Sequence, residues 1–171
     1  DGLPENAPEL TLSCLLDEYR TTREKRFTNT TRRAQASAGL LIVGLQQRLL
    51  SSIEAFARSL KVHRATVERQ WEKKKDAAST DSVAIRDKET ELFITTPDAD
   101  DERAEWTSED LEAEEKTQIE AVTAKAEADS TRDTTTKALW EKEQKLLNQM
   151  QTIVEETKHL PDAKTRRLID W

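Results

Sequence analysis

The stretch LLIVGLQQRLLSSIEAFARSL, residues 40–60, is the part of the chain in which large apolar residues are densest. Leu41, Leu45 and Leu49 follow one another at four-residue steps and give a helix one apolar face, with Ile42 and Leu50 half a turn round. The two serines at 51–52 interrupt this pattern with hydroxyls that can cap a helix, and Glu54 completes a capping sequence. We therefore predict two helices joined at the serines, with their apolar stripes forming the core.

The second of these helices extends well beyond the stretch. Its apolar residues recur at three- and four-residue steps, which is typical of an amphipathic helix, and they are Ile53, Phe56, Ala57, Leu60, Val67 and Trp71. Three lysines at 73–75 follow, and positive charge suits the carboxyl end of a helix. We predict that this helix ends at the lysines.

The composition favours an all-α fold. Of the 171 residues, 35% are hydrophobic and 36% are charged, which leaves too little apolar side chain for a thick globular core. Three glycines, four prolines and an aromatic content of 5% argue against a sheet-rich structure. We therefore predict an elongated helical bundle. The single cysteine, Cys14, excludes an intramolecular disulfide, and its apolar neighbours predict that it is buried.

A second helical segment is predicted over residues 107–159. Thr107 and Ser108 supply cap hydroxyls, and a sparse apolar stripe close to the heptad period continues until Pro161. One uninterrupted helix of this length would span about 75 Å. Residues 129–136 are poor in apolar and helix-favouring side chains, so a kink or a short loop there remains an alternative. We expect this helix to pack antiparallel against the helix that follows Ser52, as a long coiled-coil-like hairpin.

Charge divides the chain into four segments. Residues 1–75 carry 14 basic and 9 acidic side chains and form the basic helical segment with the apolar core stretch. Residues 76–106 lack periodicity and have the composition of an acidic linker or a disordered segment. Residues 107–159 form the long helix, and residues 160–171 begin a further element.

Motifs of the common enzyme classes are absent. The sequence contains no glycine-rich phosphate loop, no Gly-x-Ser-x-Gly elbow and no His-Glu-x-x-His helix. Glu156 and His159 have the spacing used in di-iron bundles, but a second copy is missing, and two surface histidines, His63 and His159, are the simpler interpretation. We predict no catalytic residue, no metal ligand and no cofactor-binding residue in these 171 positions.

Five arginines of the first segment are candidates for contact with nucleic-acid phosphates. Lysine and arginine supply sequence-independent affinity for the phosphate backbone. Only Tyr19 and Phe27 are aromatic residues among them, so base stacking is not indicated. The alternative is that these arginines balance the acidic residues 98–115 or solvate a helix. The candidates are Arg20, Arg23, Arg26, Arg32 and Arg33.

A resemblance to a known family rests on two strings. The first is LQQRLLSSIEAF, residues 45–56, followed by Leu60 and His63. It resembles the stretch after the first motor lobe of bacterial Swi/Snf-like helicase ATPases of superfamily two. Ile53 stands where proline is usual in that family, which removes the rigid helix start but leaves the serine cap.

The second string is LPDAKTRRLIDW, residues 160–171, and it is similar to the start of the second motor lobe in the same proteins. The strings occur in the family's order and cover about 30 of the 171 residues. Among bacterial members, the helicase of DISARM anti-phage systems is similar in this part.

The resemblance implies a non-catalytic helical insertion between the motor lobes of an ATP-dependent DNA helicase or translocase. ATP and Mg²⁺ would bind the parent protein outside this segment, and the partners would be DNA, the flanking lobes and a protein docked on the helical protrusion. The alternative is an autonomous coiled-coil scaffold or oligomerisation module, suggested by the stripe over residues 139–154. The absence of an 18-residue apolar run and of a signal peptide predicts a cytoplasmic protein without membrane contact.

Overall fold

The chain folds into five helices in the computed structural model, which describes residues 7–76, 107–128, 134–161, 165–166 and 169. No strand occurs within these ranges, so the all-α prediction is confirmed. The helices are α1 (Pro8–Phe27), α2 (Arg32–Ser51), α3 (Ile53–Asp76), α4 (Ser108–Ala128) and α5 (Thr134–Thr157).

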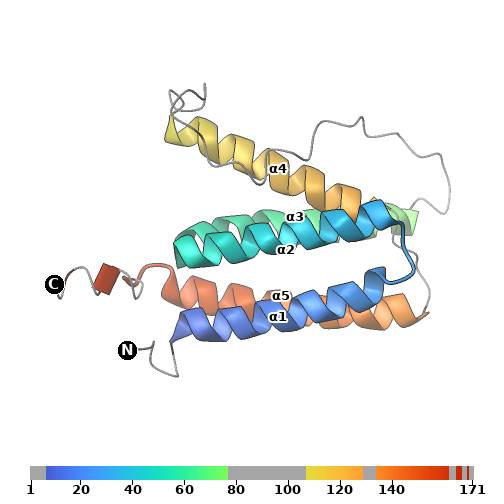
Figure 1. Cartoon of the computed structure of the whole chain (residues 1–171), viewed down its shortest axis with the longest axis horizontal. Coiled ribbons are helices and arrows are strands. Elements are labelled where there is room, and N and C mark those ends of the chain that lie inside the picture. Colours follow the sequence, from blue (N-terminus) through green and yellow to red (C-terminus); the bar gives the residue numbers. More distant parts are fainter. Residues whose placement is uncertain (1–6, 77–106, 129–133, 162–164, 167–168, 170–171) are drawn as a thin grey trace.

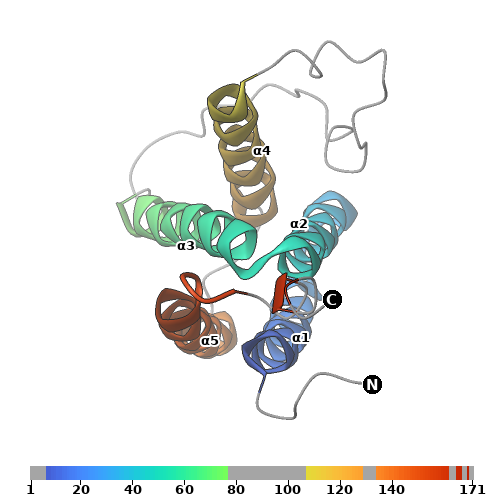
Figure 2. The same cartoon turned by 90° about the vertical axis from the view of Figure 1, so that its left-hand side faces the viewer.

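The helices form three layers. α1 and α5 pack side by side in one layer, α2 and α3 form the middle layer, and α4 lies across the other face of α2 and α3 (Figure 2). α1 begins and α5 ends at the same end of the bundle (Figure 1). The opposite end therefore gathers the last turns of α1 and α3 and the first turns of α2 and α5.

The predicted break at the two serines is confirmed. Ser52 adopts an extended backbone conformation between α2 and α3, and its N–H donates to the Arg48 carbonyl at 2.9 Å. Its Oγ accepts a hydrogen bond of 3.0 Å from the Ala55 N–H. This side chain therefore satisfies a backbone donor that the first turn of α3 leaves without an intrahelical partner.

The predicted start of α4 is also confirmed. The Thr107 Oγ1 accepts from the Asp110 N–H at 3.3 Å, and Asp110 Oδ2 accepts from the Thr107 N–H at 3.2 Å. This reciprocal pair is a capping box, which stabilises the first turn of a helix.

The prediction of one long hairpin helix over residues 107–159 is wrong. α4 packs against α2 and α3, whereas α5 packs against α1 and α3, so the two helices lie in different layers. The apolar stripe therefore serves two separate interfaces, with Ile119 and Val122 in one and Leu147 and Met150 in the other. The predicted linker at 76–106 lies outside the described residues, apart from Asp76 at the end of α3.

The core runs through all three layers, and the largest group of buried apolar residues joins all five helices. Cys14 is exposed, so the prediction that it is buried is wrong. The inward face of α1 is the stripe through Leu12, Leu16 and Tyr19, and position 14 lies two residues from Leu12, on the opposite side of the helix.

Gly39 provides a test of how α2 is packed. It lies in the interior of α2, where glycine is less favourable than alanine, and a Cβ added there meets no atom within 4 Å. We predict that Gly39→Ala raises the free energy of unfolding by about 0.5–1 kcal/mol, measured by urea denaturation in dilute solution. Ala36→Gly, at an exposed position of the same helix, is the matched control and should lower it by a similar amount. A destabilising Gly39→Ala would contradict this description of α2.

Candidate functional site: a buried arginine–glutamate cluster

The structure separates the five predicted arginines into two groups. Arg23 and Arg26 are buried, with exposed fractions of 1% and 4%, whereas Arg20, Arg32 and Arg33 are exposed. The interpretation of all five as one solvent-facing basic surface is therefore wrong for Arg23 and Arg26. The reason is their position on α1, where they continue the inward stripe of that helix.

Arg26 bridges two glutamates from the other half of the chain. Its Nε and Nη2 donate to the two carboxylate oxygens of Glu143 on α5, at 2.7 and 2.8 Å. Its Nη1 and Nη2 donate to the oxygens of Glu127 on α4, at 2.9 and 2.6 Å. Both carboxylates are bound by two hydrogen bonds each, the geometry in which arginine binds a carboxylate most strongly.

Arg23 completes the cluster one turn earlier on α1. Its Nη2 lies 2.9 Å from Glu127 Oε1, and its Nη1 lies 3.6 Å from Glu143 Oε2. These are ion pairs by distance, and the first lacks the alignment of a hydrogen bond. The Phe27 ring lies against both guanidinium groups, 4.9 Å from Arg23 Cζ and 4.6 Å from Arg26 Cζ.

A neutral hydrogen-bond chain extends the cluster to α3. Arg23 Nη1 donates to the Tyr19 hydroxyl at 3.0 Å, and this oxygen lies 2.6 Å from His63 Nε2. The other ring nitrogen, Nδ1, lies 2.9 Å from Thr123 Oγ1 on α4. His63 is fully buried, so the interpretation of both histidines as surface residues is wrong, whereas His159 is exposed.

Burial and neighbouring charge set the protonation of these groups. Burial lowers the pKa of His63 well below its ordinary value, and the Arg23 charge acts in the same direction. Burial raises the pKa of Tyr19. Burial alone would lower the pKa of the Arg26 guanidinium. The negative charges of Glu127 and Glu143 have the larger effect and raise this pKa. Burial raises the pKa of Glu143, against the opposing effect of Arg26. His63 is therefore neutral at pH 7.

The cluster joins helices and presents no reactive group to solvent. Both carboxylates are occupied by guanidinium groups and are almost fully buried, with exposed fractions of 2% for Glu127 and 0% for Glu143. Across the described residues, no three His, Cys, Asp or Glu side chains come together in a way that could hold a metal ion. The arrangement fixes α1, α3, α4 and α5 relative to one another, which is a mechanical role.

The three exposed arginines differ in what surrounds them. Arg20 pairs with Asp17 at 2.9 Å and with Glu24 at 3.8 Å. Arg32 and Arg33 form the first turn of α2, where positive charge opposes the helix dipole. This first turn of α2 lies at the end of the bundle away from the start of α1 (Figure 1).

Sequence reasoning missed Tyr19, His63, Glu127 and Glu143 as one group. A usable signal was present on α1, because Arg23 and Arg26 follow Tyr19 by four and seven residues and so share its buried face. The acidic partners lie 101 and 117 residues away from Arg26, and no local pattern marks them.

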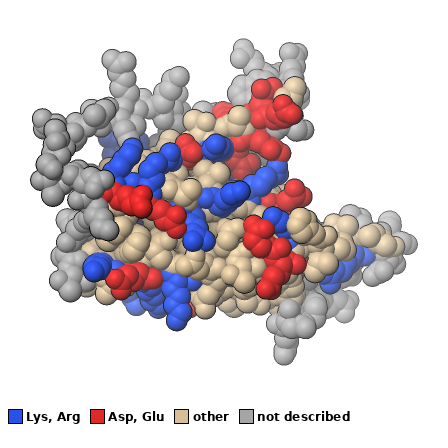
Figure 3. Space-filling view, turned by 180° about the vertical axis from the view of Figure 1, so that it is seen from behind, with Lys and Arg blue, Asp and Glu red and all other residues tan. Residues whose placement is uncertain are grey.

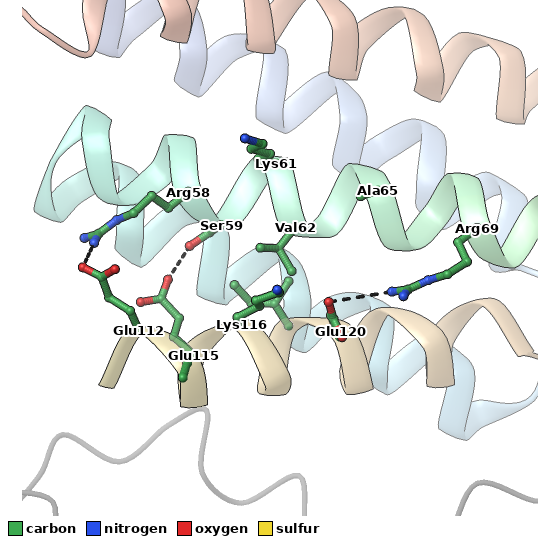
Figure 4. Close-up of a pocket in the computed structure, with 12 residues that line it drawn as sticks. Arg58, Ser59, Lys61, Val62, Ala65, Arg69, Glu112, Glu115, Lys116 and Glu120 are labelled. Carbon is green, nitrogen blue, oxygen red and sulfur yellow. Dashed lines mark hydrogen bonds and ion pairs between the residues drawn. The ribbon is translucent and has the colours of Figure 1, made fainter. Parts of the chain in front are cut away.

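A groove with a volume of about 630 Å³ lies between α3 and α4 (Figure 4). Its acidic side chains are paired: Glu112 with Arg58, Glu115 with Ser59 at 2.6 Å, and Glu120 with Arg69 at 3.8 Å. On the face seen in Figure 3, basic and acidic side chains are likewise interspersed. Neither surface presents charge of one sign.

Two tryptophans mark the contact between α3 and α5. The rings of Trp71 and Trp140 are stacked, with centroids 4.5 Å apart and planes at 8°. The stack joins the last turns of α3 to the beginning of α5, so it fastens the same end of the bundle as the arginine–glutamate cluster.

Comparisons with protein-family models, with curated proteins and with solved structures find no match to this chain. None of the described helices combines the length and the apolar character that crossing a bilayer requires.

The cluster predicts a strong dependence of stability on each charge. Replacing Glu143 by Gln leaves two buried guanidinium groups facing one carboxylate, and we expect the free energy of unfolding to fall by about 3–5 kcal/mol. Glu18→Gln is the control, because Glu18 pairs with Lys142 at 2.8 Å while both side chains are half exposed, and it should change the free energy by less than about 1 kcal/mol. Equal effects of the two substitutions in urea denaturation would contradict the proposed role of the cluster.

His63 predicts a dependence of stability on pH. Below its ordinary pKa of 6.5, the unfolded chain binds a proton at His63 that the folded chain does not bind. The free energy of unfolding should therefore fall as the pH drops from about 7 to about 5, by up to about 1.4 kcal/mol per pH unit from this residue. In a plot of the free energy of unfolding against pH, His63→Gln should flatten the slope between about pH 5 and about pH 7, and His159→Gln should leave that slope unchanged. Because Glu143 is present in every variant, the difference in slopes isolates His63, and identical slopes would exclude its protonation as the cause.

Proposed function

We propose that this chain is a non-catalytic helical insertion of an ATP-dependent DNA helicase or translocase. The observation that carries the proposal is that α1 begins and α5 ends at the same end of the bundle (Figure 1). A bundle with this arrangement can be inserted between two neighbouring domains without separating them by its own length. ATP and Mg²⁺ would bind the motor lobes outside these residues.

Exposed leucines at that end support a contact with neighbouring domains. Leu10 in the first turns of α1 is 39% exposed, and Leu160, just after α5, is 54% exposed. Ile169, in the string that resembles the start of the second motor lobe, is 73% exposed. Large apolar side chains left in water can form part of a surface that binds a partner.

The first resembling string has a clear structural role. Leu45 and Leu49 are buried at the end of α2, Phe56 and Leu60 are buried at the start of α3, and Ser52 caps the junction between the helices. The family-like pattern thus coincides with the helix–cap–helix unit around which the core is built.

The buried cluster and the tryptophan stack suit a rigid spacer. An insertion that transmits force between lobes must keep its shape while they move, and ionic groups that are satisfied only in one arrangement favour one shape. Arg20, Arg32 and Arg33 remain the candidates for contact with the DNA backbone, since their side chains are exposed.

The coiled-coil scaffold is less well supported. That hypothesis was based on the apolar stripe of α5. Three residues of this stripe, Leu146, Met150 and Val154, are buried within the chain, with exposed fractions of 4%, 0% and 0%. The residues that would form an intermolecular seam are thus already occupied by α1 and α3.

The proposal predicts where ATP hydrolysis and DNA binding reside. The full-length protein should hydrolyse ATP and the fragment 1–171 should not. In the full-length protein, Arg32→Glu with Arg33→Glu should weaken DNA binding and reduce the slope of log Kd against log salt concentration by about 2, because about two phosphate contacts are lost.

The control is Lys61→Glu with Lys116→Glu, an equal change of charge at exposed positions beside the α3–α4 groove. This pair should leave the salt slope close to that of the unmodified protein. ATP hydrolysis by the fragment would refute the assignment as a non-catalytic insertion, and an unchanged slope in the arginine variant would refute the DNA contact.

A further inference from the structure

α4 is the outermost helix of the bundle and is buried over only half of its length. It packs against α2 and α3, while α1, α2, α3 and α5 lie around a shared core on its inner side (Figure 2). Residues 109–118 of α4 include no buried side chain. A helix with few buried contacts opens more readily than the rest of a protein. The buried side chains of α4 are Ile119, Val122, Thr123, Ala126 and Glu127.

A hydrogen-bond chain holds this buried half to α3 and α1. The Tyr19 oxygen accepts from Arg23 Nη1 at 3.0 Å, so the hydroxyl proton of Tyr19 is left to donate to His63 Nε2 at 2.6 Å. Within the described residues, no other acceptor lies within hydrogen-bond distance of this proton. His63 therefore carries its single proton on Nδ1, which donates to Thr123 Oγ1 at 2.9 Å. The chain is complete only while Nε2 carries no proton.

A second proton on His63 would break this chain. It would turn Nε2 into a donor, so the buried Tyr19 hydroxyl would lose its acceptor, which is costly. It would also add a third cation to a core in which two arginines balance two glutamates.

The titratable and charged groups that surround His63 come from three helices. The stretch of α2 at 34–47 contains no ionisable side chain, and residues 59–60 and 66–67, one turn away from His63 on α3, are uncharged. No neighbouring group is therefore left to neutralise the added charge. The surrounding groups are Tyr19, Arg23 and Arg26 on α1, Glu127 on α4 and Glu143 on α5.

We propose that α4 is a detachable helix and that His63 is a pH-sensitive switch for its release. Because α4 supplies the partner of Nδ1, its departure brings water to that side of the imidazole, and Glu127 is hydrated as well. The open form then takes up a proton near the ordinary pKa of 6.5, whereas burial holds the pKa of His63 well below this value in the closed form. The open form is therefore favoured as the pH falls below about 6.5.

Release would change the surface of the molecule. Ile119 and Val122 pack into the main apolar core, and Ala126 packs with Phe27 and Ala34. The departure of α4 would uncover the apolar surface beneath these residues while the other four helices stay packed. Exposed apolar patches are surfaces on which a partner binds. This property belongs to the bundle itself and is independent of any motor lobes joined to it.

Hydrogen exchange of the whole chain 1–171 tests the release. The protection factor, the ratio of the intrinsic to the observed amide exchange rate, is measured for residues 119–127 of α4 and 146–154 of α5. The α4 amides should be less protected than the α5 amides at every pH, because α4 opens without unfolding of the other helices. From about pH 7.5 to about pH 5, α4 protection should fall about 10- to 30-fold, because opening becomes up to about tenfold more favourable per pH unit below the pKa of exposed histidine. Equal protection of the two helices, or a pH-independent protection of α4, would overturn the proposal.

Two substitutions separate the proton from the packing. His63→Gln should abolish the fall in α4 protection, because glutamine takes up no proton. Thr123→Val removes the acceptor of Nδ1–H but keeps the imidazole, so it should lower α4 protection at about pH 7.5 at least about threefold and retain the further fall on acidification. His159→Gln, at an exposed position, is the matched control and should behave as the unmodified chain. A His63→Gln variant that keeps the full pH dependence would refute the proposal.

Discussion

Four buried charges determine how this bundle is assembled. Two arginines from α1 meet one glutamate from α4 and one from α5, and all four side chains are removed from water. Moving these groups out of water costs several kcal/mol per ion, and only the complete set offsets that cost. Any arrangement in which α4 or α5 shifted away from α1 would leave an unpaired charge in the core. We interpret the cluster as the constraint that selects one packing of otherwise generic amphipathic helices.

The rest of the architecture follows from the position of this constraint. Glu127 lies at the carboxyl end of α4, so that end is fixed in the core, while the first turns of α4 are exposed and diverge from the middle layer (Figure 1). Those turns are joined to α2 and α3 by partly exposed pairs such as Arg48–Glu115, at 2.8 Å. Exposed pairs contribute little, so α4 is stable at one end and weakly bound at the other.

How much of this could be predicted from the sequence depends on whether the signal is local. The helix junction at Ser52 and the start of α4 at Thr107 were predictable, since a cap acts on backbone groups within three residues. A kink or short loop at residues 129–136 was an alternative from the sequence, but the packing of α4 and α5 in different layers was not predicted, because a sparse heptad-like stripe does not distinguish one interface from two.

The cluster escaped sequence reasoning for a different reason. Because arginine is rarely buried, its charge led to the prediction that Arg23 and Arg26 lie on the surface. Their spacing from Tyr19 on α1 instead puts them on the buried face of that helix. Pairing across more than 100 residues leaves no trace in local composition.

The most direct test of this account is a double-mutant cycle between Arg26 and Glu143. Arg26→Met and Glu143→Leu are made singly and together, and the free energy of unfolding is measured for each protein. The account predicts that the double variant is more stable than the sum of the two single effects implies, with a coupling of at least about 2 kcal/mol, because each single change leaves a charge without its partner. Strictly additive effects would show that the cluster does not hold the bundle together.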